Sequence, residues 1–476
     1  MFKRASVVCI TLFLLLLLIA SGCGSGKAGQ QYEQVPLGET KSLFTQESTK
    51  APAAAATTAE PVKAEEMTIK NYDFYAYKPS TKKVDDVPGS GTKNGKVILG
   101  YMDGLSGSSA YIAKECMAAC RMAVENQGTI WGKEIELLTG DAVDPASARS
   151  EYERMKSLGC RIFMGGLNNS QTDKSICNFV DNDKVLLFSN ISWDVELFSR
   201  GVKNMFQWCP SFLKFGDQLA NATLEISQEY LGIKPEDLKI AICYQEGAGE
   251  VCQGYVDGLA RRNKKPAFIE GYPQDRKDFT PLVAQLIAGN YDVIVPFSSL
   301  VEGPALRRKM VEMGYKPPLL LACGSYYDQS VFTELGNDVT NGCCTQSYTT
   351  GAINENEAAG LKEFKAMFNA EFGRDPLTHA LMSYSATTTW MRMMDLIGEM
   401  PIPELVEELR KVDVQPGQSP AYWGLLPDPE TGRNLRGGEP CVVGQWQDGK
   451  LIMVYPKFLA TSEDAKLYIP WHEKGW

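Results

Sequence analysis

The chain has 476 residues, of which 44% are hydrophobic and 22% charged, and its formal net charge at pH 7 is −10. These are ordinary globular proportions, and the length suggests two or three domains, so a disordered, a collagen-like and a polytopic membrane protein are excluded. An acidic surface repels phosphate backbones, and we therefore expect no nucleic-acid partner.

The amino terminus has the pattern of an export signal. Residues 1–22 have two basic residues near their start, Lys3 and Arg4, continue as an apolar run and end in small residues. The apolar run is shorter than the roughly 20 residues that a membrane-spanning helix needs. The sequence at 20–23, Ala-Ser-Gly-Cys, resembles a bacterial lipobox. This resemblance implies that residues 1–22 are a lipoprotein signal peptide, and that an acylated Cys23 anchors the protein outside the cytoplasmic membrane.

Residues 23–95 are interpreted as a flexible tether. They are rich in Ala, Pro, Gly, Ser and Lys and show no sustained apolar period. The aromatic residues Tyr72, Phe74, Tyr75 and Tyr77 leave open an alternative, in which a short strand packs on the body of the protein.

The cysteine pattern argues against a metal site. Of the 13 cysteines, one lies in the signal and one is Cys23, which leaves an odd number for the body. Either a few disulfides coexist with buried thiols, or the compartment is reducing. Cys116 and Cys120 are one helical turn apart and Cys343 and Cys344 are adjacent, and neither spacing resembles a zinc pair. With only two histidines in the chain, we expect no structural metal and no cofactor.

From Lys96 onward, short apolar runs alternate with longer amphipathic stretches. The runs predict parallel strands buried on both faces, at residues 96–101, 133–138, 160–166, 184–189, 239–244, 292–297 and 318–323. Helices are predicted between them, at residues 109–127, 145–158, 211–231, 248–263, 279–289 and 302–314. The alternation predicts right-handed βαβ crossovers. This number of strands predicts two α/β lobes, with a break near Trp208-Cys209-Pro210.

The last part of the chain is mostly helical. Two helices are predicted at 354–372 and 377–398, with Gly373 ending the first. Residues 441–456 predict a hairpin that turns at Asp448-Gly449. Sheets of this kind bind ligands outside the carboxyl ends of their strands, so the cleft between the two lobes is the expected site.

Several segments together resemble one family. They are ILGYMDGLSGSSA (98–110), GTIWG with KEIELL (128–138), DFTPLVAQLIAGNYDVIV (278–295), KEFKAMFNAEFGRDP with Tyr384 (362–384) and the GQWQDGK hairpin. The body from Lys96 to Pro456 resembles the type I periplasmic binding proteins, in the leucine/isoleucine/valine-binding branch that serves ABC importers. The resemblance implies two Rossmann-like doubly wound lobes, joined by three crossovers, that close on a small solute.

The resemblance also implies domain boundaries and partners. Lobe 1 is expected at 96–209 with 348–436, lobe 2 at 210–347 with 437–456, and a C-terminal tail at 457–476. The expected partners are a small-molecule solute, an ABC permease and the lipid anchor, and the expected state is a monomer. The open alternative is a sensing lipoprotein of the same fold that signals to a membrane receptor.

Two loops of lobe 1 match ligand-binding loops of the family. The loop at 165–172 has Asn169 or Ser170 where the family places a hydroxyl residue, and the loop at 189–194 matches at Asn190 and Ser192. The alternative is that both loops are ordinary helix N-caps. The candidate ligand-binding residues are Tyr111, Asn169, Ser170, Asn190, Ser192, Trp193, Ser298, Ser325 and Tyr326.

Two departures from the family bear on the ligand. Amino-acid binders hold the ligand ammonium with carboxylates at two positions, where this chain has Phe212 and Ser325, and a buried ammonium without a partner is costly. An α-amino acid therefore requires a substitute such as Asp194, Glu246 or Asp328. The aromatic residues near the loops favour an aromatic acid, an amide or another ligand with a flat apolar surface.

The sequence does not predict an enzyme. It contains no Walker loop, no GxSxG, no HExxH and no GxGxxG that opens the first helix, so no catalytic residues are assigned.

Overall fold

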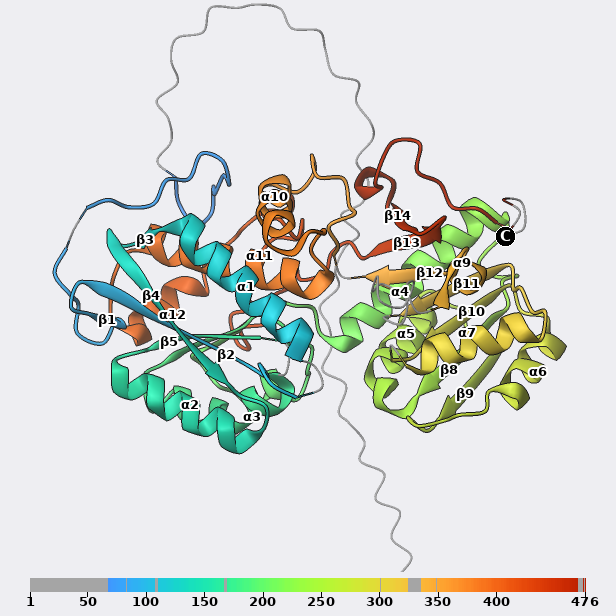
Figure 1. Cartoon of the computed structure of the whole chain (residues 1–476), viewed down its shortest axis with the longest axis horizontal. Coiled ribbons are helices and arrows are strands. Elements are labelled where there is room, and N and C mark those ends of the chain that lie inside the picture. The colour runs from blue at the N-terminus through green and yellow to red at the C-terminus, as the bar shows by residue number, and fades with distance from the viewer. Residues whose placement is uncertain are drawn as a thin grey trace, which may run out of the picture. The chain divides into compact units, whose positions relative to one another are not determined.

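Figure 1 shows the computed structural model of the chain. The structure describes residues 67–82, 84–107, 110–166, 169–299, 301–323, 335–347, 349–469, 474 and 476. All of them belong to one compact unit. None of the helices described is long and apolar enough to cross a membrane.

The first sheet has the order β3-β4-β2-β5-β6-β7, and β1 pairs with β2 at its side. Its central pairs are parallel, whereas β1 and β3 pair antiparallel with their neighbours. The strands are β1 (Thr92–Lys93), β2 (Lys96–Asp103), β3 (Thr129–Ile130), β4 (Lys133–Asp141), β5 (Ile162–Gly165), β6 (Leu186–Ser189) and β7 (Met205–Gln207).

Helices cover both faces of this sheet (Figure 1). Successive side chains of β2 point to opposite faces of the sheet. Leu99 therefore packs with one set of helices and Ile98 with the other. One set is α1 (Ala110–Gln127), α10 (Leu361–Phe372), α11 (Thr378–Ile397) and α12 (Ile402–Leu409). The other is α2 (Pro145–Leu158) and α3 (Asn169–Val180).

The second sheet has the order β14-β13-β12-β11-β10-β8-β9. Strands β8 to β12 pair in parallel, and β13 and β14 add an antiparallel hairpin. The strands are β8 (Ile240–Gln245), β9 (Phe268–Tyr272), β10 (Val293–Phe297), β11 (Leu319–Cys323), β12 (Cys344–Ser347), β13 (Val442–Gln447) and β14 (Lys450–Tyr455).

The second sheet is also covered on both faces. Its helices are α4 (Phe212–Ile226), α5 (Gly249–Arg261), α6 (Thr280–Gly289), α7 (Glu302–Glu312) and the short α9 (Asn337–Thr340). Helices α4 and α5 pack on one face and α6 and α7 on the other. The chain passes between the two sheets after β7, after β12 and before β13. The predicted fold class is thus confirmed, and each sheet with its helices is called a lobe below.

The expectation of a flexible tether is wrong for residues 67–82 and 84–95, which we call the N-terminal strap. Its side chains Tyr72, Phe74 and Tyr77 are buried in the core of the first lobe, although they form a turn and not a strand. The guanidinium of Arg392 on α11 donates to the Tyr72 hydroxyl at 2.7 Å and lies 4.1 Å from the centre of the Phe74 ring. Asp395 accepts from the Tyr77 hydroxyl at 2.7 Å.

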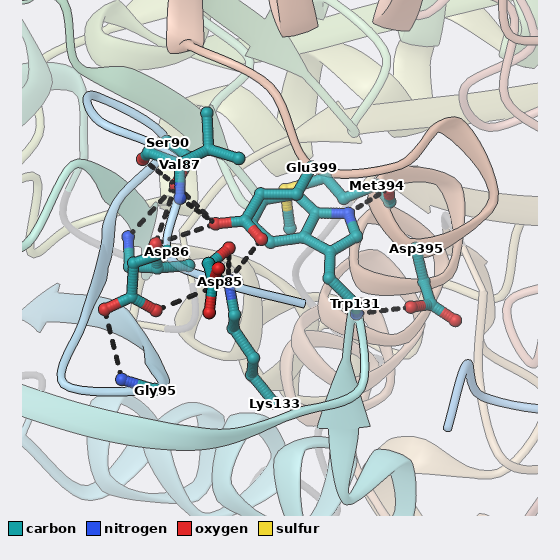
Figure 2. Close-up of polar contacts among 11 residues, drawn as sticks. Asp85, Asp86, Val87, Ser90, Gly95, Trp131, Lys133, Met394, Asp395 and Glu399 are labelled. Atoms are coloured by element: carbon teal, nitrogen blue, oxygen red, sulfur yellow. Dashed lines mark hydrogen bonds and ion pairs between the residues drawn. The ribbon is translucent and has the colours of Figure 1, made fainter. Parts of the chain in front are cut away.

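The strap continues along the same side of α11 (Figure 2). The carboxylate of Glu399, just after the helix, accepts from the backbone of Val87 and from the hydroxyls of Ser90 and Thr92, at 3.0, 2.9 and 2.7 Å. It also forms an ion pair with Lys133, and both side chains are 3% exposed. Asp395 in the last turn of α11 and Glu399 just beyond the end of that helix thus hold successive parts of the strap.

Two further expectations can be compared with the structure. The helix predicted at 354–372 begins only at Leu361, because residues 354–360 form turns that end at Gly360, which has φ +81°. All 11 cysteines within the described residues are free and buried.

Candidate functional site

The carboxyl ends of the parallel strands lie side by side at one edge of each sheet. In the first sheet, β2, β5 and β6 end at Asp103, Gly165 and Ser189. The register pairs Gly165 with Ser189 and places Asp103 one residue beyond the pair of Met102 with Gly165. Sequence positions far apart therefore meet at the edge where such folds bind ligands.

Two buried carboxyl groups mark this edge of the first lobe. Asp103 is fully buried, accepts from the Tyr101 hydroxyl at 3.0 Å and lies so close to Gly166 that a Cβ there would be 1.8 Å from its Oδ2. Asp173 on α3 is 2% exposed and accepts from the Ser189 hydroxyl at 2.5 Å. Neither carboxyl group was among the predicted site residues.

The two carboxyl groups influence each other. Burial raises the pKa of Asp173 to about 7, the hydrogen bond from Ser189 opposes this rise, and the charge of Asp103 adds to it. Burial, followed by the charge of Asp103, also holds the pKa of Tyr101 well above its usual value. Burial therefore lets the Asp173 carboxyl keep its proton to a higher pH than an exposed aspartate does.

Asn190 and Ser192 follow β6 and are buried, at 0% and 1% exposure. Asn190 donates from Nδ2 to the hydroxyl of Thr387 on α11 at 3.2 Å, while the other end of its amide has no partner among the described residues. The Ser192 hydroxyl also has no partner there. Buried polar atoms are nearly always hydrogen-bonded, so unpaired ones are candidates for ligand or water contacts.

An aromatic cluster joins the two lobes next to these residues. The ring of Trp193 stacks on Phe212, the first residue of α4, with the ring centres 5.7 Å apart. The edge-to-face contact between Trp193 and His379 on α11 has a centre distance of 5.8 Å. The backbone N–H of Phe212 donates to the carbonyl of Trp193 at 3.1 Å. Flat apolar surface and unpaired polar atoms thus occur within a few residues of one another.

The corresponding edge of the second lobe is held by its own hydrogen bonds. Ser298, directly after β10, is 8% exposed, and its hydroxyl hydrogen-bonds that of Tyr272 at 2.7 Å. The backbone N–H of Ser299 donates to Gln245 Oε1 at 3.1 Å, and its hydroxyl hydrogen-bonds Glu302. Ser299 and Glu302 thus have the spacing of a helix-capping pair.

The other predicted residues are placed as follows. Tyr111, the second residue of α1, is 50% exposed. Asn169 and Ser170 are the first residues of α3, and their side chains lie outside the described part, as do Cys23, Ser325 and Tyr326. The predicted roles of these residues stay predictions.

Asp194 is one of the acids that could replace the family's carboxylate partner of a ligand ammonium, but in this structure it is paired with a lysine. Its carboxylate forms an ion pair with Lys174 at 2.6 Å, and Lys174 also pairs with Glu196 at 2.9 Å. Other first-lobe acids near the strand ends are Asp103 and Asp173, which are buried, and Asp141, which is exposed at the end of β4. Nowhere in the described ranges do three or more His, Cys, Asp or Glu side chains gather as a metal site would require.

A cavity of about 630 Å³ lies elsewhere, beside the strap. It is lined by Met67, Thr68, Ile69, Leu396, Ile397, Met400, Glu404, Glu407 and Glu408. Its α11 residues are at the opposite end of that helix from His379, roughly 27 Å away at 1.5 Å per residue. The cavity therefore does not belong to the site at the strand ends.

Comparison with known proteins decides the family. Residues 96–450 match the sequence model of the family described as periplasmic binding protein. The chain belongs to the periplasmic binding protein family. The predicted resemblance is therefore confirmed, and the chain is a solute-binding protein, not an enzyme. The family is extracytoplasmic and serves ABC importers.

Relatives of this binding protein have been named for branched-chain amino acids. Leu/Ile/Val-binding protein homolog 8 of Brucella abortus is 26% identical over 376 residues, which are 77% of this chain and 92% of the relative. Homolog 7 of Brucella suis is 25% identical over 383 residues, covering 79% and 95%.

Solved structures share the fold of this binding protein. A putative branched-chain amino acid ABC transporter protein of Silicibacter pomeroyi is similar with a TM-score of 0.68 and 15% identity, covering 79% of this chain and 99% of that one. A substrate-binding protein of Streptococcus pneumoniae in complex with isoleucine has a TM-score of 0.60 and 16% identity, covering 78% and 99%. A solute-binding protein of Rhodopseudomonas palustris with 3,4-dihydroxybenzoic acid has a TM-score of 0.61 and 15% identity, covering 79% and 99%.

Proposed function

We propose that this binding protein captures a small solute at the facing strand ends of its two lobes and delivers it to an ABC permease. The observation that carries the proposal is the group of buried polar atoms without partners at Asn190 and Ser192, beside the aromatic contact of Trp193 with Phe212. This contact joins the loop after β6 to the first helix of the second lobe, so a solute held there touches both lobes.

The solute is of the amino-acid, amide or aromatic-acid type. The names of the relatives support the first class, and the solved structure with dihydroxybenzoic acid supports the last. Closure of the lobes is part of the proposal, because a solute that contacts both lobes binds the closed form better and shifts the equilibrium towards it. The boundaries that we propose for the moving parts are 96–209 with 348–436 and 210–347 with 437–456.

We further propose that Cys23 carries the lipid anchor. The lipobox-like sequence at 20–23 supports this assignment. Radiolabelled palmitate should enter the full chain in cells that process lipoproteins, and Cys23→Ala should abolish the labelling. Labelling that persists in this variant would contradict the anchor and leave the binding function untouched.

A thermal-shift screen tests the binding function. The probes are L-leucine, L-isoleucine, L-valine, L-phenylalanine, acetamide and 4-hydroxybenzoate. A solute at 100 times its Kd adds about 2.7 kcal/mol to the free energy of unfolding, which is readily measured. Ser192→Ala should lose the shift, whereas Ser157→Ala, an exposed serine on α2, is the matched control. A solute that stabilises the Ser192 variant as fully as the control would show that the site lies elsewhere.

A further inference from the structure

We infer that residues 207–212, where the chain leaves the first lobe, fix the shape of the loop that holds the solute, and that the side chains of Gln207 and Cys209 do this. Residues 207–212 are called the first crossover below, and residues 189–193 the solute loop. The inference rests on the proposed function, because it assigns positioning residues to the same site. Neither side chain was among the predicted site residues.

Backbone hydrogen bonds join the two ends of the solute loop to the first crossover. The backbone N–H of Trp208 donates to the carbonyl of Ser189 at 3.1 Å, at the start of the loop. The backbone N–H of Phe212 donates to the carbonyl of Trp193, also at 3.1 Å, at its end. Any residue except proline supplies such a donor, so these two bonds do not depend on the side chains at 208 and 212.

Two carbonyls within the loop accept from side chains of the same crossover. Gln207 Nε2 donates to the carbonyl of Ser192 at 2.7 Å, and the thiol of Cys209 donates to the carbonyl of Asn190 at 3.0 Å. Gln207 is 1% exposed and Cys209 is fully buried. These bonds require a side-chain donor of suitable length at each position, so the amino-acid sequence of the crossover specifies them.

Cys209 is held in the protonated form, which can donate. Burial keeps the pKa of its thiol well above the usual value, and the hydrogen bond from the backbone N–H of Ser192 opposes this rise. The thiol therefore keeps its proton at neutral pH. One side chain thus bonds two residues of the loop, since it donates to the carbonyl of Asn190 and accepts from the N–H of Ser192.

The first crossover is itself fixed by the chain that leads to β13. The backbone N–H of Gln207 donates to the carbonyl of Gly432 at 2.9 Å, and Asn434 Nδ2 donates to the carbonyl of Trp208 at 3.0 Å. A Cβ at Gly437 would lie 2.9 Å from the same carbonyl, so the two segments pack with no room for a side chain there. Both side-chain donors are therefore carried by a backbone that is held in place.

The side-chain oxygens of the loop are the atoms that this arrangement leaves for the solute. Asn190 Oδ1 and Ser192 Oγ are buried and have no partner among the described residues. Their positions follow the peptide groups on either side, which the first crossover holds. Binding groups must stay within about 0.5 Å of their productive geometry. Gln207 and Cys209 therefore act on the solute through the loop and not by contact with it.

The test compares variants that remove each donor with one that restores it. Cys209→Ala and Gln207→Met remove the donor, and methionine keeps an unbranched side chain of similar length. Cys209→Ser replaces the thiol by a hydroxyl donor. Cys160→Ala is the matched control, because Cys160 is a buried thiol that donates to the carbonyl of Ile162 at 3.2 Å, at the opposite end of the first sheet.

Isothermal titration calorimetry on the purified full chain measures the Kd of L-leucine and of 4-hydroxybenzoate. For a probe that binds, Cys209→Ala and Gln207→Met should each raise the Kd by about 5- to 10-fold, the effect of one lost hydrogen bond. Cys209→Ser and Cys160→Ala should stay within about 2-fold of the unchanged chain. Urea unfolding of every variant separates a general loss of stability, which both alanine variants share, from a loss of affinity.

Hydrogen exchange gives a second measurement that needs no solute. The backbone N–H of Ser192 bonds the sulfur of Cys209, so its exchange reports directly on this contact. Exchange in a peptide that covers residues 189–193 should be about 10-fold faster in Cys209→Ala and Gln207→Met than in the unchanged chain. In Cys160→Ala it should be unchanged.

The outcomes separate the inference from the proposed function. An unchanged Kd in Cys209→Ala or Gln207→Met overturns the assignment of that residue, and a Cys209→Ser variant as weak as Cys209→Ala overturns that of Cys209, while solute binding stands. If neither probe binds, the proposed function loses these two solutes and exchange decides the inference. Faster exchange in the loop then supports it, and unchanged exchange overturns it. If one variant fails to fold by circular dichroism, the other decides.

Discussion

The ion pair of Lys133 with Glu399 gives the sharpest prediction about stability (Figure 2). Replacing Lys133 by Met keeps most of the unbranched apolar stem of the side chain and leaves the Glu399 carboxylate buried without its cation. Lys133 also donates to the carbonyl of Asp85 at 3.0 Å and lies 3.4 Å from Asp86, so two further strap contacts are lost.

The expected cost follows from the burial of both groups. Removing one partner of a buried pair typically costs about 3–5 kcal/mol. Three other donors still reach Glu399, from Val87, Ser90 and Thr92, which places the expected value near the lower limit, at about 3 kcal/mol. For a lobe of this size, that corresponds to a decrease in Tm of roughly 6–12 °C.

The assay is urea unfolding followed by circular dichroism, with a double-mutant cycle. Glu399→Gln removes the charge that Lys133→Met leaves unpaired, so the double variant should be more stable than the sum of the two single changes implies, by about 1–3 kcal/mol. Lys96→Met is the matched control. Its partner Glu136 is 3.9 Å away and both side chains are nearly half exposed, so the cost should be below about 1 kcal/mol.

The pH dependence checks the same pair. Burial alone would raise the pKa of Glu399, but the hydrogen bonds from Lys133, Val87, Thr92 and Ser90 outweigh it, so the pKa is lowered in the folded state. The stabilisation is therefore present above the unfolded-state pKa near 4.5 and is lost as the pH falls through the lower folded-state pKa. Strictly additive costs, or a Lys133→Met cost no larger than that of the control, would refute this reasoning.

Three more predictions concern other parts of the chain. Gly166→Ala should lower stability by about 1–3 kcal/mol in urea unfolding, because its Cβ would overlap the carboxylate of Asp103, and an unchanged midpoint would contradict the packing. The pKa of Asp173, raised to about 7, makes the folded state lose stability as the pH rises from about 4 to 7, and Asp173→Asn should flatten this slope in thermal melts at several pH values. A chain that begins at residue 96, where the family match starts, should unfold at a markedly lower urea concentration than one that begins at residue 67, and equal midpoints would show that the strap contributes nothing.

The elements of the two sheets could be predicted because burial on both faces leaves a pattern in the sequence itself. The run at 96–101 became β2, and the helix predicted at 145–158 has the same bounds in the structure, with Asp144 as its N-cap. Short elements such as β3 and β7 were missed, since two or three residues carry no period. Helix α3 was expected only as a helix that the loop at 165–172 opens, and its bounds were not predicted because its polar first half reads as a loop.

The parts that could not be predicted depend on partners distant in the sequence. The strap looks like a linker because its composition is polar. Its tyrosines Tyr72 and Tyr77 are buried by contacts that include Arg392 and Asp395, more than 300 residues away. An aromatic cluster within a polar segment was the available signal. In the candidate site, the loop after β6 was predicted to bind the ligand. The structure buries Asn190 and Ser192 and leaves polar atoms of both without partners among the described residues, and the role of the loop in binding stays a prediction.

The acids of the site illustrate the same limit. Asp103 lay outside the strand predicted at 96–101, although an Asp that directly ends a buried apolar strand is an informative position. Asp194 was considered as an ammonium partner, but its pairing with Lys174 could be known only once α3 was placed. Neither the periodicity nor the composition of the sequence predicts which charged residues pair when they are close in space but far apart in the chain.

The burial of all 11 described cysteines has a practical consequence. Thiol reagents should leave the native protein largely unlabelled, and Cys23 is blocked if it is acylated. New cysteines at Leu158 on α2 and Ile269 on β9, which are 45% and 47% exposed, would then be the reactive thiols on the two lobes. A pair of fluorescent dyes attached there would report by energy transfer, molecule by molecule, whether and how far the lobes approach each other when a solute is added.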